Sequence, residues 1–291
     1  MTEAEELVAK LAEFRGDPVG FVKWAFEWGQ NELAGYTGPF EWQQKILEAI
    51  GAGLPLDRAI RVACVSGHGV GKSCLVSWIL LWSMSTAAGT KGVCTAGTED
   101  QLKTKLWAEL SKWYRLFKGR EHFVLGATSL ISADSERALQ WRIDAIPWTE
   151  RSSQSFAGLH NQSRRLVVVF DEASTIADVI FEVVEGALTD KSTERIFCCF
   201  GNPISNIGRF REIFEGREHE RWFTLRVDSR DVPITSRKEI EESIAFHGED
   251  SDMSGAVIRH SFRVRAPCNS SPATRSREPW RACRPAPRLT A

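Results

Sequence analysis

The sequence lacks a long uninterrupted run of apolar residues. Its longest apolar stretch, around residues 75–82, includes Ser77 and follows Lys72 closely. No N-terminal segment combines basic residues with an apolar core of about 7–15 residues, so neither a membrane span nor a secretory signal is predicted. We therefore expect a soluble protein that is not exported and does not contact a membrane.

Paired patterns of cysteine and histidine are missing as well. Of the seven cysteines, Cys198 and Cys199 are adjacent, and no C-x-x-C sequence occurs. The six histidines are scattered, and the H-x-E sequence that starts at His247 has no cysteine pair to complete it. These absences argue against a disulfide framework and a structural zinc site. Reduced thiols are typical of a cytoplasmic protein.

What the chain does contain is enough apolar surface for a large core. Hydrophobic residues make up 43% of its 291 residues, with 11 tryptophans and 16 phenylalanines. The net charge of −1 averages two unlike parts, because residues 253–291 hold eight arginines and one acid and carry +7, which leaves −8 for residues 1–252. Nucleic acid would therefore have to meet a local basic patch on an acidic body.

Helix-like and strand-like segments alternate along most of the chain. Apolar residues recur at helical spacing in residues 1–35, and Pro39 precedes a second short helix at 40–50. Apolar and β-branched runs predict strands at residues 59–65, 92–96, 165–170, 195–200 and 222–227. Helical patterns lie at residues 72–84, 98–117 and 176–188. This alternation predicts an α/β fold with a mostly parallel sheet flanked by helices.

A glycine-rich loop, S66-G-H-G-V-G-K-S73, follows the first predicted strand. It differs from the pattern G-x-x-x-x-G-K-[ST] only at its first position, where Ser66 stands. Backbone N–H groups of such a loop can point at one anion, Lys72 can neutralise phosphate oxygens, and the Ser73 hydroxyl can bind Mg²⁺. The predicted nucleotide-binding residues here are Ser66, Gly67, His68, Gly69, Val70, Gly71, Lys72 and Ser73.

Two carboxylates end the most apolar strand, V167-V-V-F-D-E172. Asp171 lies 99 residues after Lys72 and can hold Mg²⁺, while Glu172 can polarise an attacking water. An isolated acid pair at a strand end is often only a solvated terminus. Following a phosphate loop in the same sheet, it favours an ATPase with a catalytic glutamate over a GTPase switch.

Two further motifs allow a functional and a structural interpretation. Asn202, in Phe200-Gly201-Asn202-Pro203, can sense a terminal phosphate, although Gly-Asn-Pro is also an ordinary turn. Gln43 offers a donor and an acceptor edge that suit adenine, beside aromatic residues that can stack on the base. The alternative there is a helix start with a buried Trp42. The acidic run at residues 239–242 is interpreted as a solvated helix face.

Together these motifs resemble the large subunit of the tailed-bacteriophage or prophage terminase, the ATPase that drives DNA into the capsid. They follow the family's order over about residues 36–230. The residues that carry the resemblance are Trp42-Gln43, S66-G-H-G-V-G-K-S73, T95-A-G97, W141-R-I-D-A-I-P-W148, F156-A-G-L-H160, V167-V-V-F-D-E-A173 and Phe200-Gly201-Asn202-Pro203. The resemblance implies a RecA-like P-loop ATPase fold of the ASCE type.

The resemblance also assigns roles and partners. It implies that Gln43 selects adenine, that Lys72 and Glu172 are catalytic with Asn202 as coupling residue, and that Ser73 and Asp171 hold Mg²⁺ beside bound ATP. The implied partners are double-stranded DNA, the small terminase subunit, the portal protein and further copies of the chain in a ring. The implied place is the cytoplasm of the bacterial host, and the protein is not expected in the virion.

His68 is one departure from the family, because many members carry arginine at that position. If such a cation is needed, another residue must supply it. The candidates from the sequence are Arg142, Arg151, Arg164 and Arg165.

The second departure concerns the carboxyl-terminal part. We expect a helical segment at 1–50, an ATPase core at 51–232, and at 233–252 a linker that in the family leads to a nuclease domain. Only 64 residues follow Val227, so no nuclease activity is expected. Residues 253–291, with five of the eleven prolines, form an irregular basic tail. This tail is either a disordered arm that contacts DNA or, as we favour, the product of a shifted reading frame.

Two alternatives to a packaging motor remain. A helicase or another DNA-dependent translocase shares this core, but it would carry a second RecA-like domain for which the chain has no room. A truncated prophage remnant would bind nucleotide without turning it over. Catalytic turnover separates the packaging motor from the remnant.

Overall fold

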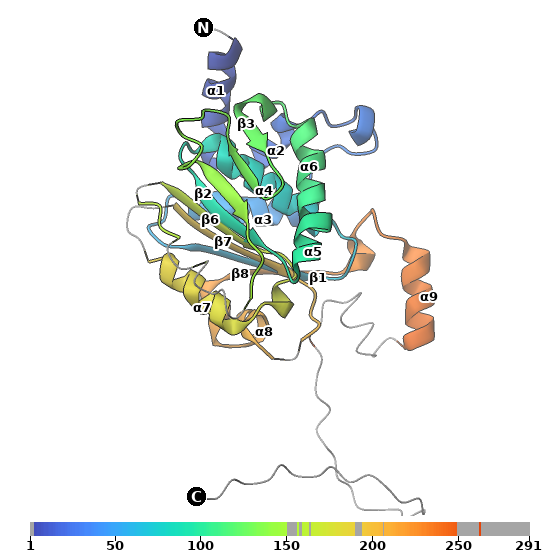
Figure 1. The fold of residues 1–291 in the computed structure, drawn as a ribbon. Coiled ribbons are helices and arrows are strands. Elements are labelled where there is room, and N and C mark those ends of the chain that lie inside the picture. Colours follow the sequence, from blue (N-terminus) through green and yellow to red (C-terminus); the bar gives the residue numbers. More distant parts are fainter. Residues whose placement is uncertain are drawn as a thin grey trace, which may run out of the picture.

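A single eight-stranded sheet organises the part of the chain that the computed structural model describes, namely residues 3–149, 156, 159–162, 164–189, 194–205, 207–248 and 262. Its strand order is β3-β4-β5-β2-β6-β7-β1-β8, and only the β3–β4 and β4–β5 pairs are antiparallel (Figure 1). The strands are β1 (Ile60–Ser66), β2 (Lys91–Thr95), β3 (Phe123–Leu125), β4 (Ser129–Ser132), β5 (Arg142–Ala145), β6 (Arg165–Phe170), β7 (Glu194–Gly201) and β8 (Phe223–Val227). The predicted mostly parallel α/β sheet is confirmed.

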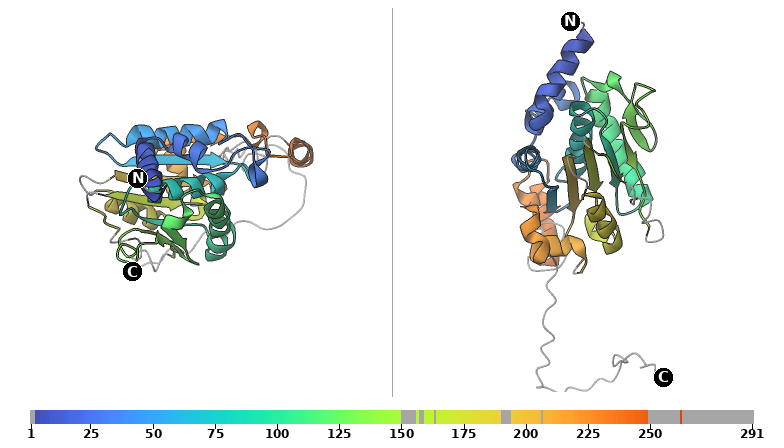
Figure 2. Two further views of the ribbon diagram at one scale, coloured as in Figure 1. Left: turned by 90° about the horizontal axis from the view of Figure 1, so that it is seen from above. Right: turned by 90° about the vertical axis from the view of Figure 1, so that its left-hand side faces the viewer.

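Helices cover both faces of this sheet (Figure 2). On one face lie α1 (Glu3–Glu13), α2 (Pro18–Ala25), α3 (Glu41–Gly53), α4 (Lys72–Thr86) and α6 (Trp107–Leu116). On the other lie α7 (Asp178–Ala187) and α8 (Arg209–Glu215). The short α5 (Glu99–Gln101) is joined to α6 by a π-helical turn, Leu102–Leu106. None of the described helices combines the length and apolarity required to cross a bilayer.

The central strands are buried on both faces, as their near-continuous apolar sequence predicts. In β6, Val167 and Val169 face α4, whereas Val168 and Phe170 pack on the α7 side, where the ring of Phe170 meets that of Phe181 edge-on at 5.0 Å. This alternation follows from the two-residue period of a strand. The sheet thus anchors helices on both sides without a polar face.

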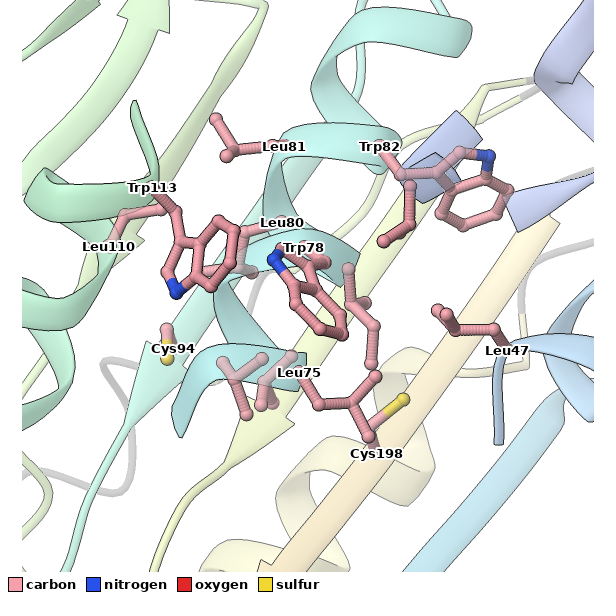
Figure 3. Close-up of a cluster of buried hydrophobic side chains, with 14 of the residues drawn as sticks. Leu47, Leu75, Trp78, Leu80, Leu81, Trp82, Cys94, Leu110, Trp113 and Cys198 are labelled. Atoms are coloured by element: carbon pink, nitrogen blue, oxygen red, sulfur yellow. The ribbon is translucent and has the colours of Figure 1, made fainter. Parts of the chain in front are cut away.

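Helix α4 is the centre of the larger core. Figure 3 shows side chains of α4 between those of its neighbours, with Trp78 beside Trp113 of α6 and Leu47 of α3 nearby. The Trp78 and Trp113 rings are 4.9 Å apart and edge-on. Because α4 is apolar on all sides and buried, its amino end is fixed firmly against the sheet. The tryptophans of this region fill the core.

Helix α9 (Arg237–His247) lies apart from the sheet in Figure 1. Ser236 caps it through a hydrogen bond from the backbone N–H of Glu239 to its side chain, and none of its residues is buried. The expectation that residues 239–242 form a solvated helix face is confirmed. The tail at 253–291, apart from Phe262, lies outside the described residues.

Candidate nucleotide-binding site

Three neighbouring strands deliver the predicted motifs to one edge of the sheet. Strand β7 lies between β6 and β1 and runs parallel to both, with Val65 opposite Gly201 and Phe170 opposite Cys199. The loop after β1, Asp171 after β6 and Asn202 after β7 therefore meet at the carboxyl ends of the strands. Open α/β sheets bind their ligands at this edge.

The loop between β1 and α4 adopts the backbone that its glycines permit. Gly69 and Gly71 have φ angles of 71° and 94°, in the left-handed region where a side chain would be strained. Helix α4 begins at Lys72, so its free N–H groups and positive dipole end face the loop. This is the local structure that binds an anion such as phosphate.

Lys72 is held by three acceptors at this edge. Its Nζ donates to Oγ of Ser66 at 2.9 Å, to the carbonyl oxygen of Gly67 at 2.7 Å and to Oδ1 of Asn202 at 2.7 Å. Burial lowers the pKa of Lys72, while the nearby carboxylate of Asp171 raises it. Ser66, at the position where the motif has glycine, thus contributes its hydroxyl to the lysine.

Asn202 joins Lys72 to His68. Its Nδ2 atom lies 2.9 Å from Nε2 and 3.0 Å from Nδ1 of the imidazole, and the side chain itself is buried. Burial, followed by the charge of Lys72, lowers the pKa of His68 below 6.5. These surroundings favour the neutral imidazole over its charged form, although the nearby charge of Glu172 acts in the opposite direction.

Asp171 is a buried carboxylate beside the amino end of α4. Its Oδ2 accepts a hydrogen bond of 3.4 Å from Oγ of Ser73. Burial raises the pKa of Asp171 to about 6, and the charge of Glu172 adds to this rise against the opposing charge of Lys72. A buried carboxylate in this state is stabilised by any cation that reaches it.

Ser73 and Asp171 together fit one class of metal ion. A hydroxyl and a carboxylate oxygen are hard ligands of the kind Mg²⁺ takes, and Mg²⁺ usually completes its shell with water and phosphate oxygens. Among the described residues no group of three or more His, Cys, Asp or Glu side chains could hold a metal.

Glu172 has an uncommon backbone conformation. Its φ angle of 55° lies in the left-handed region, which costs a non-glycine residue free energy and is concentrated at functional sites. Gly97 packs behind it, since a Cβ at Gly97 would lie 3.3 Å from Cβ of Glu172 and 2.5 Å from Oγ1 of Thr175. The motif T95-A-G97 thus leaves room for the Glu172 turn.

Gln43 lies beneath the loop and is 1% exposed. Its Oε1 accepts from the backbone N–H of Phe40 at 2.8 Å, and its Nε2 donates to the carbonyl oxygen of Gly71 at 3.1 Å. Gln43 therefore fixes the start of α3 and the end of the loop. A cavity of about 150 Å³ opens beside it, lined also by Tyr36 and Phe40.

A second cavity, of about 350 Å³, is lined by most of the predicted phosphate-side residues, Ser66, Gly67 and Asn202 being the exceptions. It is lined by His68, Gly69, Val70, Gly71, Lys72, Ser73, Cys74, Gln101, Lys105, Glu109, Asp171, Glu172 and Ile234. It shares Gly71, Cys74, Glu109 and Ile234 with the cavity beside Gln43. The two cavities thus follow one another along the loop.

Sequence reasoning did not include five of these lining residues: Gln101, Lys105, Glu109, Cys74 and Ile234. A signal was present for the first three, because each directly precedes a residue of the predicted buried stripe, Leu102, Leu106 and Leu110. Side chains at this four-residue spacing share one helix face. Ile234 comes from the predicted linker, and no local pattern indicated its position.

Three of the four arginines considered as substitutes at His68 lie away from the candidate site. Arg142 and Arg165 are the first residues of β5 and β6, and Arg164 directly precedes β6. Because β5, β2 and β6 run parallel, these three lie at the amino ends of strands, opposite the candidate site. Arg165 is fully buried against Trp82, 4.0 Å from its ring centre. The fourth candidate, Arg151, lies outside the described residues.

The strand order defines a RecA-like α/β architecture. In it, β7 lies between β1, which precedes the glycine-rich loop, and β6, which ends at Asp171. No family model matches the sequence. A curated relative, the "Probable terminase, large subunit" of Enterobacteria phage P7, is 24% identical over 209 residues, which are 68% of this chain and 41% of the relative. The chain thus matches about two fifths of that protein's length.

Solved structures of large terminases share the fold. The HK97 bacteriophage large terminase aligns with a TM-score of 0.61 at 14% identity, over 84% of this chain and 55% of that chain. The ATPase domain of the Thermus phage P74-26 large terminase aligns with a TM-score of 0.55 at 18% identity, over 80% of this chain and 96% of that domain.

A third structure, the large terminase of the thermophilic bacteriophage D6E in complex with ADP, aligns with a TM-score of 0.51 at 15% identity, over 71% of this chain and 50% of that chain. The predicted RecA-like fold and the resemblance to phage terminase large subunits are both confirmed. The curated relative carries the terminase name, and the solved structures share the architecture.

Proposed function

We propose that this chain is the ATPase part of a phage or prophage terminase large subunit, which couples hydrolysis of Mg-ATP to movement of double-stranded DNA into a capsid. One observation carries the proposal: groups from three separate strand ends meet at the amino end of α4, where Lys72, Asp171 and Glu172 line one cavity and Asn202 accepts a hydrogen bond from Lys72. Separate sequence motifs that meet in this way are expected of a nucleotide hydrolase.

The phosphates of ATP would bind over the loop from Gly67 to Ser73. Its backbone N–H groups and the α4 dipole attract the anion, and Lys72 exchanges its present acceptors for phosphate oxygens. Ser73 and Asp171 would hold Mg²⁺, which would supply positive charge to neutralise the phosphates. The D6E large terminase, which shares the fold, was solved with ADP, in support of nucleotide as the ligand.

Adenine would occupy the cavity beside Gln43. One N–H of the Gln43 amide and its aromatic neighbours Tyr36 and Phe40 are suited to a purine edge and face. The same amide also donates to the carbonyl oxygen of Gly71, so a shift of Gln43 on binding adenine would also shift the loop. Gln43 thus acts on the loop as well as on the base.

Hydrolysis requires a base at the terminal phosphate. Glu172, at the cavity wall, accepts a proton from water as the water oxygen bonds to the γ-phosphorus and the bond from that phosphorus to the β,γ-bridging oxygen breaks. Phosphate and ADP leave. Asn202 contacts Lys72 and His68. Its position at the end of β7 therefore depends on whether Lys72 binds the terminal phosphate.

The partners follow from the packaging role and not from the described surface. They are double-stranded DNA, a small terminase subunit, a portal protein and further copies of this chain arranged in a ring, in the cytoplasm of the host cell. The curated relative's name, a probable large terminase subunit, supports this role.

The test is a steady-state ATPase assay on the whole chain with Mg-ATP, with and without double-stranded DNA. We expect turnover in the wild type, a loss of roughly 100-fold or more in Lys72→Ala and Glu172→Gln, and retained nucleotide binding in Glu172→Gln. Glu182→Gln removes an exposed carboxylate of α7 and should behave as wild type.

Equal and substantial turnover in all four proteins would contradict the assignment of the site. Nucleotide binding without turnover in the wild type would instead favour a remnant that has lost catalysis. Stimulation by DNA distinguishes a translocating motor from an ATPase that acts without nucleic acid.

A further inference from the structure

The phosphate cavity has more acidic than basic side chains. Asp171, Glu172 and Glu109 face it as carboxylates, and the basic side chains among its described lining are Lys72 and Lys105. A nucleoside triphosphate adds about four negative charges, of which Mg²⁺ cancels two. Lys72 alone leaves the bound state strongly negative, so an additional cation at the terminal phosphate would be strongly stabilising.

His68 also lies in the loop, but the surroundings of its imidazole disfavour the charged form. Its pKa is lowered, first by burial and then by the charge of Lys72, with a further contribution from Lys105. Its imidazole nitrogens are contacted by the Asn202 amide. His68 and Lys105 line the same cavity.

Lys105 differs from its basic neighbours in its contacts. Lys103 pairs with Glu99 at 2.5 Å, and Lys112 lies 3.8 Å from Glu109. Lys105 has no hydrogen bond or ion pair with any described residue, and it is exposed at the cavity wall. An unpaired ammonium group on a flexible side chain can reach an incoming anion without first breaking a salt bridge.

The backbone beneath Lys105 is also unusual. The π-helical turn Leu102–Leu106 interrupts the helix between α5 and α6 and is closed by a hydrogen bond from the N–H of Trp107 to the carbonyl oxygen of Leu102. Leu102 and Leu106 are buried at 1% and 0% exposure, which fixes this turn on the core. Single π turns are concentrated at functional sites, because they redirect side chains.

We propose that Lys105 contacts the terminal phosphate of the bound nucleoside triphosphate and makes the site specific for ATP over ADP. The proposal rests on the nucleotide-binding function proposed above. Gln101 and Glu109, one turn away on either side of Lys105, line the same cavity and keep this helix face polar. Loss of the terminal phosphate after hydrolysis removes the partner of Lys105, so this helix also senses the nucleotide state.

The experiment compares Lys105→Ala with Lys103→Ala, which removes the same charge two residues away on the same helix, and with Lys105→Arg. Dissociation constants for ATPγS and ADP are measured with Mg²⁺ on the whole chain, together with ATP turnover and thermal unfolding. We expect Lys105→Ala to weaken ATPγS binding roughly 10-fold, to change ADP binding less than about 2-fold, and to lower kcat roughly 10- to 100-fold.

Lys103→Ala should match the wild type, and Lys105→Arg should retain most of the ATPγS preference. If Lys105→Ala and Lys103→Ala have the same ratio of ATPγS to ADP affinity, the proposal for Lys105 is overturned while the proposed function stands. If the wild type binds neither nucleotide, both proposals are overturned. The affinity ratio remains informative even in a protein that binds nucleotide without hydrolysing it.

Discussion

The Nζ atom of Lys72 donates a hydrogen bond of 2.7 Å to Oδ1 of Asn202, 130 residues later in the chain. The same Asn202 side chain contacts both ring nitrogens of His68 through Nδ2. A single buried amide therefore joins the lysine of the phosphate loop to the residue in the middle of that loop. Any movement of Lys72 toward phosphate must break or rearrange this connection.

Asn202→Asp tests that connection with almost no change in shape. A carboxylate at this position would pair with Lys72 and repel phosphate, so we expect ATP affinity to fall roughly 10-fold or more. The control is Asn31→Asp, which adds the same charge at an exposed turn of the N-terminal segment. Isothermal titration measures the affinity of each variant for ATPγS. Equal affinities in the two variants would contradict a role for Asn202 at the phosphate.

Asp171→Asn should stabilise the protein when no metal or nucleotide is bound. The pKa of Asp171 rises from 3.8 to about 6 on folding, so the folded state binds more protons and loses stability as pH rises through this window. The neutral amide avoids this loss, which is worth roughly 2–3 kcal/mol at pH 7. Urea unfolding in EDTA at pH 7 and at pH 4 measures the difference in the free energy of unfolding between Asp171→Asn and the wild type. This difference should nearly vanish at pH 4.

Arg165→Ala should cost stability at a place remote from the candidate site. Its guanidinium is 0% exposed, bonds Oε2 of Glu194 at 2.7 Å and stacks on Trp82. Removing one partner of a buried ion pair costs about 3–5 kcal/mol. Arg15→Ala removes the exposed partner of the same Glu194 and should cost less than about 1 kcal/mol. Similar urea midpoints for both variants would contradict the importance of burial.

Alkylation of Cys74 should report occupancy of the candidate site. Cys74 lines both cavities and is half-buried, whereas Cys64, Cys94, Cys198 and Cys199 are fully buried. Burial raises the pKa of Cys74 well above 9.0. The rate of Cys74 alkylation should therefore rise about 10-fold per pH unit from pH 7 to 9. Mg-ADP should slow the reaction roughly 5-fold or more. Peptide mapping by mass spectrometry measures both effects, and an unchanged rate with Mg-ADP would place the nucleotide elsewhere.

Local sequence predicted the parallel centre of the sheet closely. The run at residues 165–170 coincides with β6, and residues 59–65 differ from β1 by one position, because strands buried on both faces have a nearly continuous apolar sequence. Strands β3, β4 and β5 were missed. They are only three or four residues long, which is too short for a period of two to stand out against turns.

The sequence also identified the motifs at the strand ends, because phosphate loops and acidic strand termini depend on local chemistry. It did not identify Lys105, although Lys105 and Gln101 precede residues of the predicted buried stripe. The π turn at Leu102–Leu106 has no sequence signature comparable to glycine or proline. Such a turn is set by how the buried leucines meet the core.

The sequence by itself determined which groups could bind phosphate and a metal, since glycine backbone freedom, a lysine and two carboxylates are properties of short segments. The tertiary structure decided which of these groups meet. Placing β7 between β6 and β1 brings Asn202 to Lys72, and the same parallel order carries Arg142 and Arg165 to the opposite edge. Strand order depends on long-range packing, which no local segment specifies.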